Sequence, residues 1–189
     1  MGKGLLFVLS APSGAGKSTL IDRIRPLFPE MLYSISCTTR PSRRGERDGV
    51  HYYFLEEAQF RKMIADGKFL EWKEVHGHLY GTPAEPVAEA LNSGRHMILD
   101  IDVEGAKEVF RKIPDAVGIF ISAPSTETLE ERLRLRGTDS EESIKTRMTN
   151  AMREMDSAHY FRHRMVNDHL ETAVLELASI IGRETVKVR

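Results

Sequence analysis

The chain has 189 residues, of which 41% are hydrophobic and 29% charged, which is ordinary for a folded protein and sufficient for one domain with a sizeable core. Its 27 basic and 28 acidic side chains leave a formal net charge of −1, so the overall basic field expected of a nucleic-acid-binding protein is absent. The only cysteine is Cys37, which excludes a disulfide framework and a zinc site built on cysteines.

The apolar runs of the sequence argue against a membrane protein. The longest, Leu5–Leu9, is far shorter than the ~20 residues of a membrane span and too short for the core of a signal peptide. Leu6 occupies the position where a myristoylation signal has Ser or Thr. We therefore expect no membrane partner and a cytoplasmic location.

Strand and helix patterns alternate along much of the chain. An apolar run over residues 5–10 predicts a buried strand, and the Pro and Gly residues after it predict a tight loop. Helical spacing predicts a helix over residues 19–28, which Pro26 and Pro29 should end early. Further strands are expected over residues 96–102, 116–122 and 165–167, and further helices over 105–113, 126–136, 139–161 and 170–181.

The helix expected over residues 139–161 has a start signal and an apolar stripe. Thr138 with Glu141, or Asp139 with Glu142, has the spacing of a capping box. Apolar residues at helical spacing should pack against the core rather than bind a cofactor. The stripe consists of Ile144, Met148, Met152 and Met155.

The segment from residue 34 to residue 94 breaks this alternation. It contains short half-exposed strand patterns at 33–36, 51–54 and 69–72. Outside it, strands alternating with helices imply a mostly parallel sheet flanked by helices. We therefore predict an α/β fold with a single domain over residues 1–189. Its core should comprise about residues 1–33, 95–125 and 158–189, and residues 34–94 should form an insertion.

The strongest functional motif is the segment Ala-Pro-Ser-Gly-Ala-Gly-Lys-Ser at residues 11–18. It matches the phosphate loop GxxxxGK[ST], except that Ala occupies the first Gly position. The glycines would let backbone amides turn toward a polyphosphate, the Lys would reach the β- and γ-phosphates, and the Ser would help hold Mg²⁺. The alternative is a Gly-rich turn that binds nothing. The predicted ATP-binding residues are Ala11, Pro12, Ser13, Gly14, Ala15, Gly16, Lys17, Ser18 and Thr19.

Two acids, Asp100 and Asp102, end the strand expected over residues 96–102. The carboxyl ends of parallel strands face the ligand crevice. Asp100 is therefore a candidate to orient Mg²⁺ through a bound water, together with Ser18. The alternative is that acids at a strand end only cap the next helix.

Several further motifs identify a family. In order and approximate spacing, the chain resembles guanylate kinase, a nucleoside monophosphate kinase family with a phosphate-loop core, from residue 10 to residue 168. The motifs are Ser36-Cys37-Thr38-Thr39-Arg40-Pro41, Glu71-Trp72, Tyr80-Gly81-Thr82, Leu99-Asp100-Ile101-Asp102, Arg136-Gly137-Thr138 and Val166-Asn167-Asp168.

The resemblance implies Mg²⁺-dependent transfer of the γ-phosphoryl group of ATP to GMP or dGMP, giving ADP and GDP in purine nucleotide metabolism. The acceptor phosphate would be held by Arg40, Arg43, Tyr52 and Tyr80. Arginine forks and tyrosine hydroxyls suit a phosphate group.

The resemblance also implies a guanine-reading set: Ser36, Glu71, Thr82 and Asp102. Guanine offers N1–H and N2–H donors that a carboxylate accepts as a pair, whereas adenine presents an acceptor at N1. The hydroxyls of Ser36 and Thr82 would donate to O6 or join the surrounding network. We expect Glu71 to be partly buried because Trp72 is its neighbour.

The resemblance further implies a helical lid over about residues 126–157. Arg132 and Arg136, four residues apart, would share one helix face, and Arg147 would lie on the next helix. Arginines brought in by closure stabilise the charge of the transferring phosphoryl group. The predicted catalytic residues are Lys17, Arg40, Arg132, Arg136 and Arg147.

Two alternatives to guanylate kinase activity remain. A kinase resembling ribose 1,5-bisphosphate phosphokinase would share the core but would not need Glu71 and Asp102 to read a base. A non-catalytic guanylate-kinase-like binding module would not need the intact phosphate loop. The sequence leaves the choice between a monomer and a homo-oligomer open.

Overall fold

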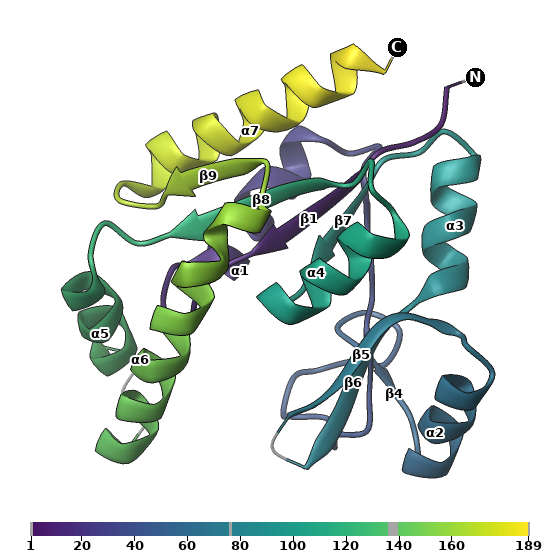
Figure 1. Cartoon of the computed structure of the whole chain (residues 1–189), viewed down its shortest axis with the longest axis horizontal. Coiled ribbons are helices and arrows are strands. Elements are labelled where there is room, and N and C mark those ends of the chain that lie inside the picture. Colours follow the sequence, from purple (N-terminus) through teal and green to yellow (C-terminus); the bar gives the residue numbers. More distant parts are fainter. Residues whose placement is uncertain (1, 76, 136–139, 189) are drawn as a thin grey trace.

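The computed structural model describes residues 2–75, 77–135 and 140–188, and the described chain folds around two sheets (Figure 1). The first sheet is parallel throughout. Its strands, in spatial order, are β2 (Leu32–Tyr33), β7 (Met97–Asp100), β1 (Leu6–Ser10), β8 (Val117–Ser122) and β9 (His163–Val166). Each strand in the middle of this sheet is a short apolar run, as expected where both faces are covered.

Helices cover both faces of this sheet, and alternate residues of β1 contact different layers. Phe7 and Leu9 belong to the same buried cluster as residues of α1 (Lys17–Ile24) and α7 (Leu170–Lys187). Leu6 and Val8 belong to the cluster that contains residues of α3 (Ala84–Asn92) and α4 (Val103–Lys112). This two-sided packing is the α/β architecture that the sequence predicts, and the fold class is confirmed.

The second sheet lies beside the first, at the lower right of Figure 1. Its strands, in spatial order, are β4 (Tyr53–Phe54), β3 (Cys37–Thr38), β6 (His78–Pro83) and β5 (Phe69–Val75), and α2 (Glu57–Ala65) packs against it. The rings of Phe60 and Phe69 stack with centroids 4.4 Å apart in its small core. Cys37 belongs to this core, and burial raises its thiol pKa to about 11, so the thiol is packing material rather than a reactive group.

Two helices, α5 (Thr126–Leu135) and α6 (Glu141–Asp156), pair as a hairpin at the other side of the first sheet (Figure 1). Ser140 caps α6 by accepting a hydrogen bond from the backbone N–H of Ser143. The capping boxes predicted here begin at Thr138 and Asp139, and those two residues lie outside the described ranges.

Several predicted boundaries differ from those of the structure. The strand pattern at 33–36 splits, because Tyr33 ends a strand of the parallel sheet and the next strand begins at Cys37. The helix expected over 139–161 ends at Asp156 and is followed by a 3-10 turn, Ser157–Tyr160; a second such turn, Arg25–Leu27, contains Pro26. Met152 is 58% exposed, so it does not belong to the apolar stripe.

Two helices, α2 and α3, lie in the segment for which the sequence predicts only short strands. The division into a core, an insertion and a lid stays a prediction. No helix in the described part of the chain combines the length and the apolar character of a membrane span.

Candidate active site

The phosphate loop connects β1 to α1 with a backbone shape that depends on two glycines. Gly14 and Gly16 have φ values of 94° and 86°, in the left-handed region that other residues rarely adopt. Gly16 is the N-cap of α1 and contributes no side chain, so the amides at this helix start are available to an anion. A Cβ on Gly16 would overlap Nδ2 of Asn167, so packing also favours glycine here.

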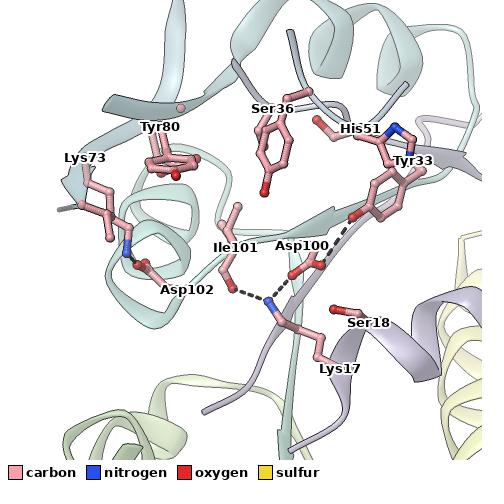
Figure 2. A pocket seen from close by; sticks show the side chains of 15 residues that line it. Lys17, Ser18, Tyr33, Ser36, His51, Lys73, Tyr80, Asp100, Ile101 and Asp102 are labelled. Carbon is pink, nitrogen blue, oxygen red and sulfur yellow. Dashed lines mark hydrogen bonds and ion pairs between the residues drawn. The ribbon is translucent and has the colours of Figure 1, made fainter. Parts of the chain in front are cut away.

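Sheet register brings Asp100 to the phosphate loop. Leu9 of β1 pairs with Asp100 of β7, so the two strands end at the same edge. Nζ of Lys17 forms an ion pair with Asp100 and also donates to the carbonyl of Ile101 at 3.4 Å (Figure 2). The Tyr33 hydroxyl donates to Oδ2 of Asp100 at 3.4 Å; burial and this nearby carboxylate raise the pKa of Tyr33, which stays a neutral donor.

One cavity of about 370 Å³ joins this edge to the second sheet. Lys17 and Ser18 line it on the side of the phosphate loop. Five of the residues predicted to bind GMP line its other side: Ser36, Tyr52, Glu71, Tyr80 and Asp102. Figure 2 shows Tyr80 and Asp102 on one side of this space and Lys17 on the other.

Glu71 enters the cavity because of an irregularity in β5. Alternation should place consecutive side chains on opposite faces, but Phe69, Leu70 and Glu71 are all buried, and a register shift separates Phe69 from Glu71. The Thr82 hydroxyl donates to Oε1 of Glu71 at 2.6 Å. Burial raises the Glu71 pKa, while this hydrogen bond opposes the rise.

Burial of Glu71 was predicted, but the reason given for it was wrong. Trp72 is 46% exposed, whereas Glu71 is 7% exposed. Thr82 joins the network through Glu71, which is one of the two roles expected of it, and it lies behind the carboxylate rather than on the cavity surface.

Two contacts hold the carboxylate of Asp102. Its Oδ1 accepts from the backbone N–H of Gly105 at 2.8 Å, so this acid does cap α4. An ion pair joins its other carboxylate oxygen to Lys73 of β5 (Figure 2).

The predicted acceptor-phosphate residues are only partly assembled. Arg40 lies next to the tyrosines, with its guanidinium 5.5 Å from the Tyr52 ring centroid, and the rings of Tyr52 and Tyr80 meet edge to face. A bidentate pair with Glu46, at 2.8 and 2.9 Å, holds Arg40, and its hydrogen bonds lower the Glu46 pKa to about 2. The Arg43 side chain is exposed and does not line the cavity.

Of the predicted lid arginines, Arg147 contacts the phosphate loop, and Arg132 contacts Asn167, which is hydrogen-bonded to that loop. Arg147 donates from Nη1 to Oγ of Ser13 at 3.1 Å. Arg132 donates from Nη2 to the carbonyl of Asn167 at 3.0 Å. Asn167 in turn donates from Nδ2 to the carbonyl of Ala15 at 2.8 Å, which ties the end of β9 to the loop. Arg136 lies outside the described residues.

The protein side chains beside the phosphate loop suit Mg²⁺ only together with the phosphate oxygens of a bound nucleotide. Ser18 and Asp100 supply a hydroxyl and a carboxylate at one end of the cavity. In the described ranges no group of three or more His, Cys, Asp or Glu side chains is placed to hold a metal. Mg²⁺ is commonly bound through one or two protein oxygens, waters and substrate phosphates, which is the arrangement these residues allow.

Sequence analysis missed several residues of this site. It assigned no role to Tyr33, Lys73, Glu46 or Gly105. Glu46 stands three residues after Arg43 in a charged segment, which is the one signal that pointed to an ion pair. The pairing of Lys73 with Asp102 spans two sheets and has no signal in the local sequence.

The parallel sheet leads into a glycine-containing loop at a helix N-terminus, with a lysine and a carboxylate beside it. The adjoining pocket has a second binding surface. These features define the class of phosphate-loop nucleotide kinases. Comparison with known proteins narrows this class. A sequence model of the guanylate kinase family matches residues 3–184, so the chain belongs to the guanylate kinase family.

Individual relatives agree with this assignment. The chain is 51% identical over 187 residues to the guanylate kinase of Carboxydothermus hydrogenoformans, covering 99% of this chain and 92% of the relative. It is 45% identical to the guanylate kinase of Sphingopyxis alaskensis, covering 99% and 86%. The crystal structure of guanylate kinase from Anaplasma phagocytophilum superposes with a TM-score of 0.77 at 28% identity, covering 97% of this chain and 87% of that one.

Proposed function

We propose that this chain is an ATP:GMP phosphotransferase that transfers the γ-phosphoryl group of ATP to GMP, and to dGMP, giving ADP and GDP. One observation carries the proposal: the cavity that contains Lys17 and Ser18 of the phosphate loop also contains the carboxylates of Glu71 and Asp102. A donor site and a base-reading site that share one cavity suit direct transfer between two bound nucleotides.

On the donor side, Lys17 would exchange its ion pair with Asp100 for the β- and γ-phosphate oxygens of ATP. Ser18 and Asp100 would hold Mg²⁺, with Asp100 acting through a water. The bound Mg²⁺ supplies positive charge that neutralises the phosphate oxygens of the nucleotide. Asn167 keeps the loop in position through the Ala15 carbonyl.

On the acceptor side, Arg40, Arg43, Tyr52 and Tyr80 would hold the phosphate of GMP. Glu71 would accept N1–H and one N2–H of guanine. Asp102 would accept the second N2–H, because the two hydrogens of the amino group point in different directions. Ser36 would donate to O6. AMP would place an acceptor, N1, against Glu71, so the site should reject adenine.

Catalysis would consist of positioning and charge stabilisation. The attacking group is already a phosphate oxygen, so no side-chain base is needed. Arg132, Arg136 and Arg147 would act from the lid, and the hydrogen bond from Arg147 to Ser13 supports this role. A cytoplasmic location is part of the proposal and rests on the single cysteine, since disulfides are rare in that compartment.

The test is a coupled assay of ADP release with purified protein, ATP and Mg²⁺. GMP, dGMP, AMP, UMP and ribose 1,5-bisphosphate are supplied in parallel. Turnover with GMP and dGMP only is the expected result. Turnover with ribose 1,5-bisphosphate only would replace the acceptor and overturn the base-reading roles. No turnover from folded protein would favour the binding-module alternative.

A further inference from the structure

Lys73 is a cation inside the base-reading part of the cavity. It lies on β5 two residues after Glu71, so both side chains are on the same face of the strand, and both line the cavity. Figure 2 shows its side chain extending past Tyr80 to Asp102. Its ammonium group forms the ion pair with Asp102 described above.

Carboxylates from several elements surround this ammonium group. Besides Asp102, it interacts electrostatically with Glu154 of α6, with Glu71 of β5 and with Glu104 of α4, while Lys17 repels it. Burial lowers the Lys73 pKa, but the carboxylates oppose that fall. The charged side chain is thereby held at the edge of the base site, with 42% of its surface exposed to solvent.

The partners of Asp102 decide what happens when a base without a 2-amino group enters. Strong discrimination arises when a missing substrate group leaves a buried polar atom unpaired. Here one oxygen of Asp102 has the Gly105 N–H and the other has Lys73. Loss of N2–H therefore leaves Asp102 with two resident partners, and the usual penalty is reduced.

We propose that Lys73 is a specificity-determining residue that widens the acceptor range to 6-oxopurine nucleotides lacking the 2-amino group, of which IMP is the simplest. This inference rests on the proposed function. Hypoxanthine keeps the N1–H donor and the O6 acceptor. Glu71 therefore loses one N2–H but keeps N1–H and the hydroxyl of Thr82, and Ser36 keeps O6. Adenine loses both features, and Lys73 offers no remedy at Glu71. The chain should thus separate GMP from IMP weakly and GMP from AMP strongly.

The experiment measures kcat/KM for GMP, IMP and AMP with wild-type protein, Lys73→Met and Lys73→Arg. In Lys73→Met the ratio of GMP to IMP should rise about tenfold, because a carboxylate left with one partner needs the 2-amino group. Lys73→Arg keeps a cation and should keep the wild-type ratio. The ratio of GMP to AMP should not change. Lys62→Met, an exposed lysine paired with Asp66 on α2, is the matched control.

Asp102→Asn provides the second arm of the test. Its side-chain oxygen can still cap α4, but it no longer pairs with an ammonium group, so adding Lys73→Met should leave its GMP to IMP ratio unchanged. Dissociation constants for GMP and IMP, measured by calorimetry, should follow the same pattern without turnover.

A GMP to IMP ratio that stays within about twofold of wild type, or falls, in Lys73→Met overturns the inference. A full effect of Lys73→Met in the Asp102→Asn background also overturns it. Either result with normal GMP turnover leaves the proposed function intact. A folded wild-type protein that does not phosphorylate GMP overturns the proposed function, and this inference with it.

Discussion

The two sides of the cavity are built in different ways. The donor side comes from one continuous segment, residues 11–18, whose backbone turns between β1 and α1. The acceptor side is assembled from residues far apart in the chain, among them Ser36, Glu71 and Asp102. Backbone amides recognise phosphate on any nucleotide, whereas side chains select one base. Changes on the donor side should therefore affect all acceptors equally, and changes on the acceptor side should affect them differently.

The largest effect is expected from Lys17→Met on the donor side. Removing the cation from the β- and γ-phosphates should lower kcat by about 10³-fold with every acceptor, since one donor to developing charge is worth about that much. Asp100 loses its lysine partner but keeps the Tyr33 hydroxyl, and its side chain, which is 21% exposed, stays hydrated. Steady-state kinetics together with circular dichroism would test this. A variant with a near-wild-type rate would show that Lys17 is not catalytic.

The next effect is expected from Glu71→Gln on the acceptor side. The amide would present a donor toward N1–H and N2–H of guanine, so kcat/KM for GMP should fall about 10²-fold while KM for ATP changes little. Glu74→Gln is the matched control, because Glu74 is exposed on the same strand. Equal losses with ATP and GMP would place Glu71 outside the base pocket.

The role proposed for Glu71 also predicts how kcat/KM for GMP depends on pH. Burial raises the Glu71 pKa, and in the proposed site only the ionised carboxylate would accept both guanine donors. As pH falls, kcat/KM for GMP should decline at a pH above the ordinary pKa of glutamate, about 4.3. Glu71→Gln should lack this decline. A wild-type profile that is flat down to the ordinary glutamate pKa would contradict it.

A smaller effect is expected at Gly105, a position to which no sequence motif points. A Cβ at this position would lie 2.9 Å from Oε2 and 3.2 Å from Cδ of Glu71. Gly105→Ala should therefore displace the carboxylate and lower kcat/KM for GMP about tenfold. Alanine is the better helix former, so the free energy of unfolding should not fall. Kinetics and thermal unfolding would measure both, and unchanged GMP kinetics would show that Glu71 can shift without cost.

The contrast between a continuous loop and a pocket assembled from distant residues also explains which parts of the site could be predicted from the sequence. The phosphate loop is local, and its glycines, lysine and serine are recognisable from spacing alone. The carboxylates of the acceptor side were named because motifs resembled a family, whereas their surroundings depend on tertiary contacts. Thr82 meets Glu71 across paired strands, and Lys73 meets Asp102 across two sheets. Neither contact follows from periodicity or local propensity.

The predicted helices and strands also succeeded where local sequence signals were sufficient and failed where they were not. Buried strands of the parallel sheet were predicted within a residue or two, because an apolar run between turn residues has few alternatives. Helices α2 and α3 were missed where short amphipathic segments adjoin strands. The burial of Glu71 was inferred from Trp72, but the β5 register shift causes it, and a one-residue shift cannot be read from composition.

The smallest effect is expected at Glu184, which lies outside both sides of the cavity and serves as a reference for them. Its carboxylate is 4% exposed and accepts from Arg162, His163 and Lys187 at 2.9, 3.1 and 2.6 Å. Burial opposes ionisation of Glu184, but hydrogen bonds from Lys187 and His163 and the charge of Arg162 outweigh it and lower its pKa. Glu184→Gln should cost about 1 kcal/mol of unfolding free energy, since Arg162 and Lys187 are largely exposed.

The pH dependence of the destabilisation caused by Glu184→Gln tests whether it arises from the lowered pKa of Glu184. A depressed carboxyl pKa stabilises the fold above the unfolded pKa of about 4.3, and this stabilisation is lost as pH falls through the lower folded pKa. The difference in unfolding free energy between wild type and Glu184→Gln should therefore be constant near neutral pH and shrink below about pH 4. Denaturant titrations at several pH values would measure it. KM values for ATP and GMP should match wild type, and a change in either would mean that this distant ion cluster is coupled to the cavity.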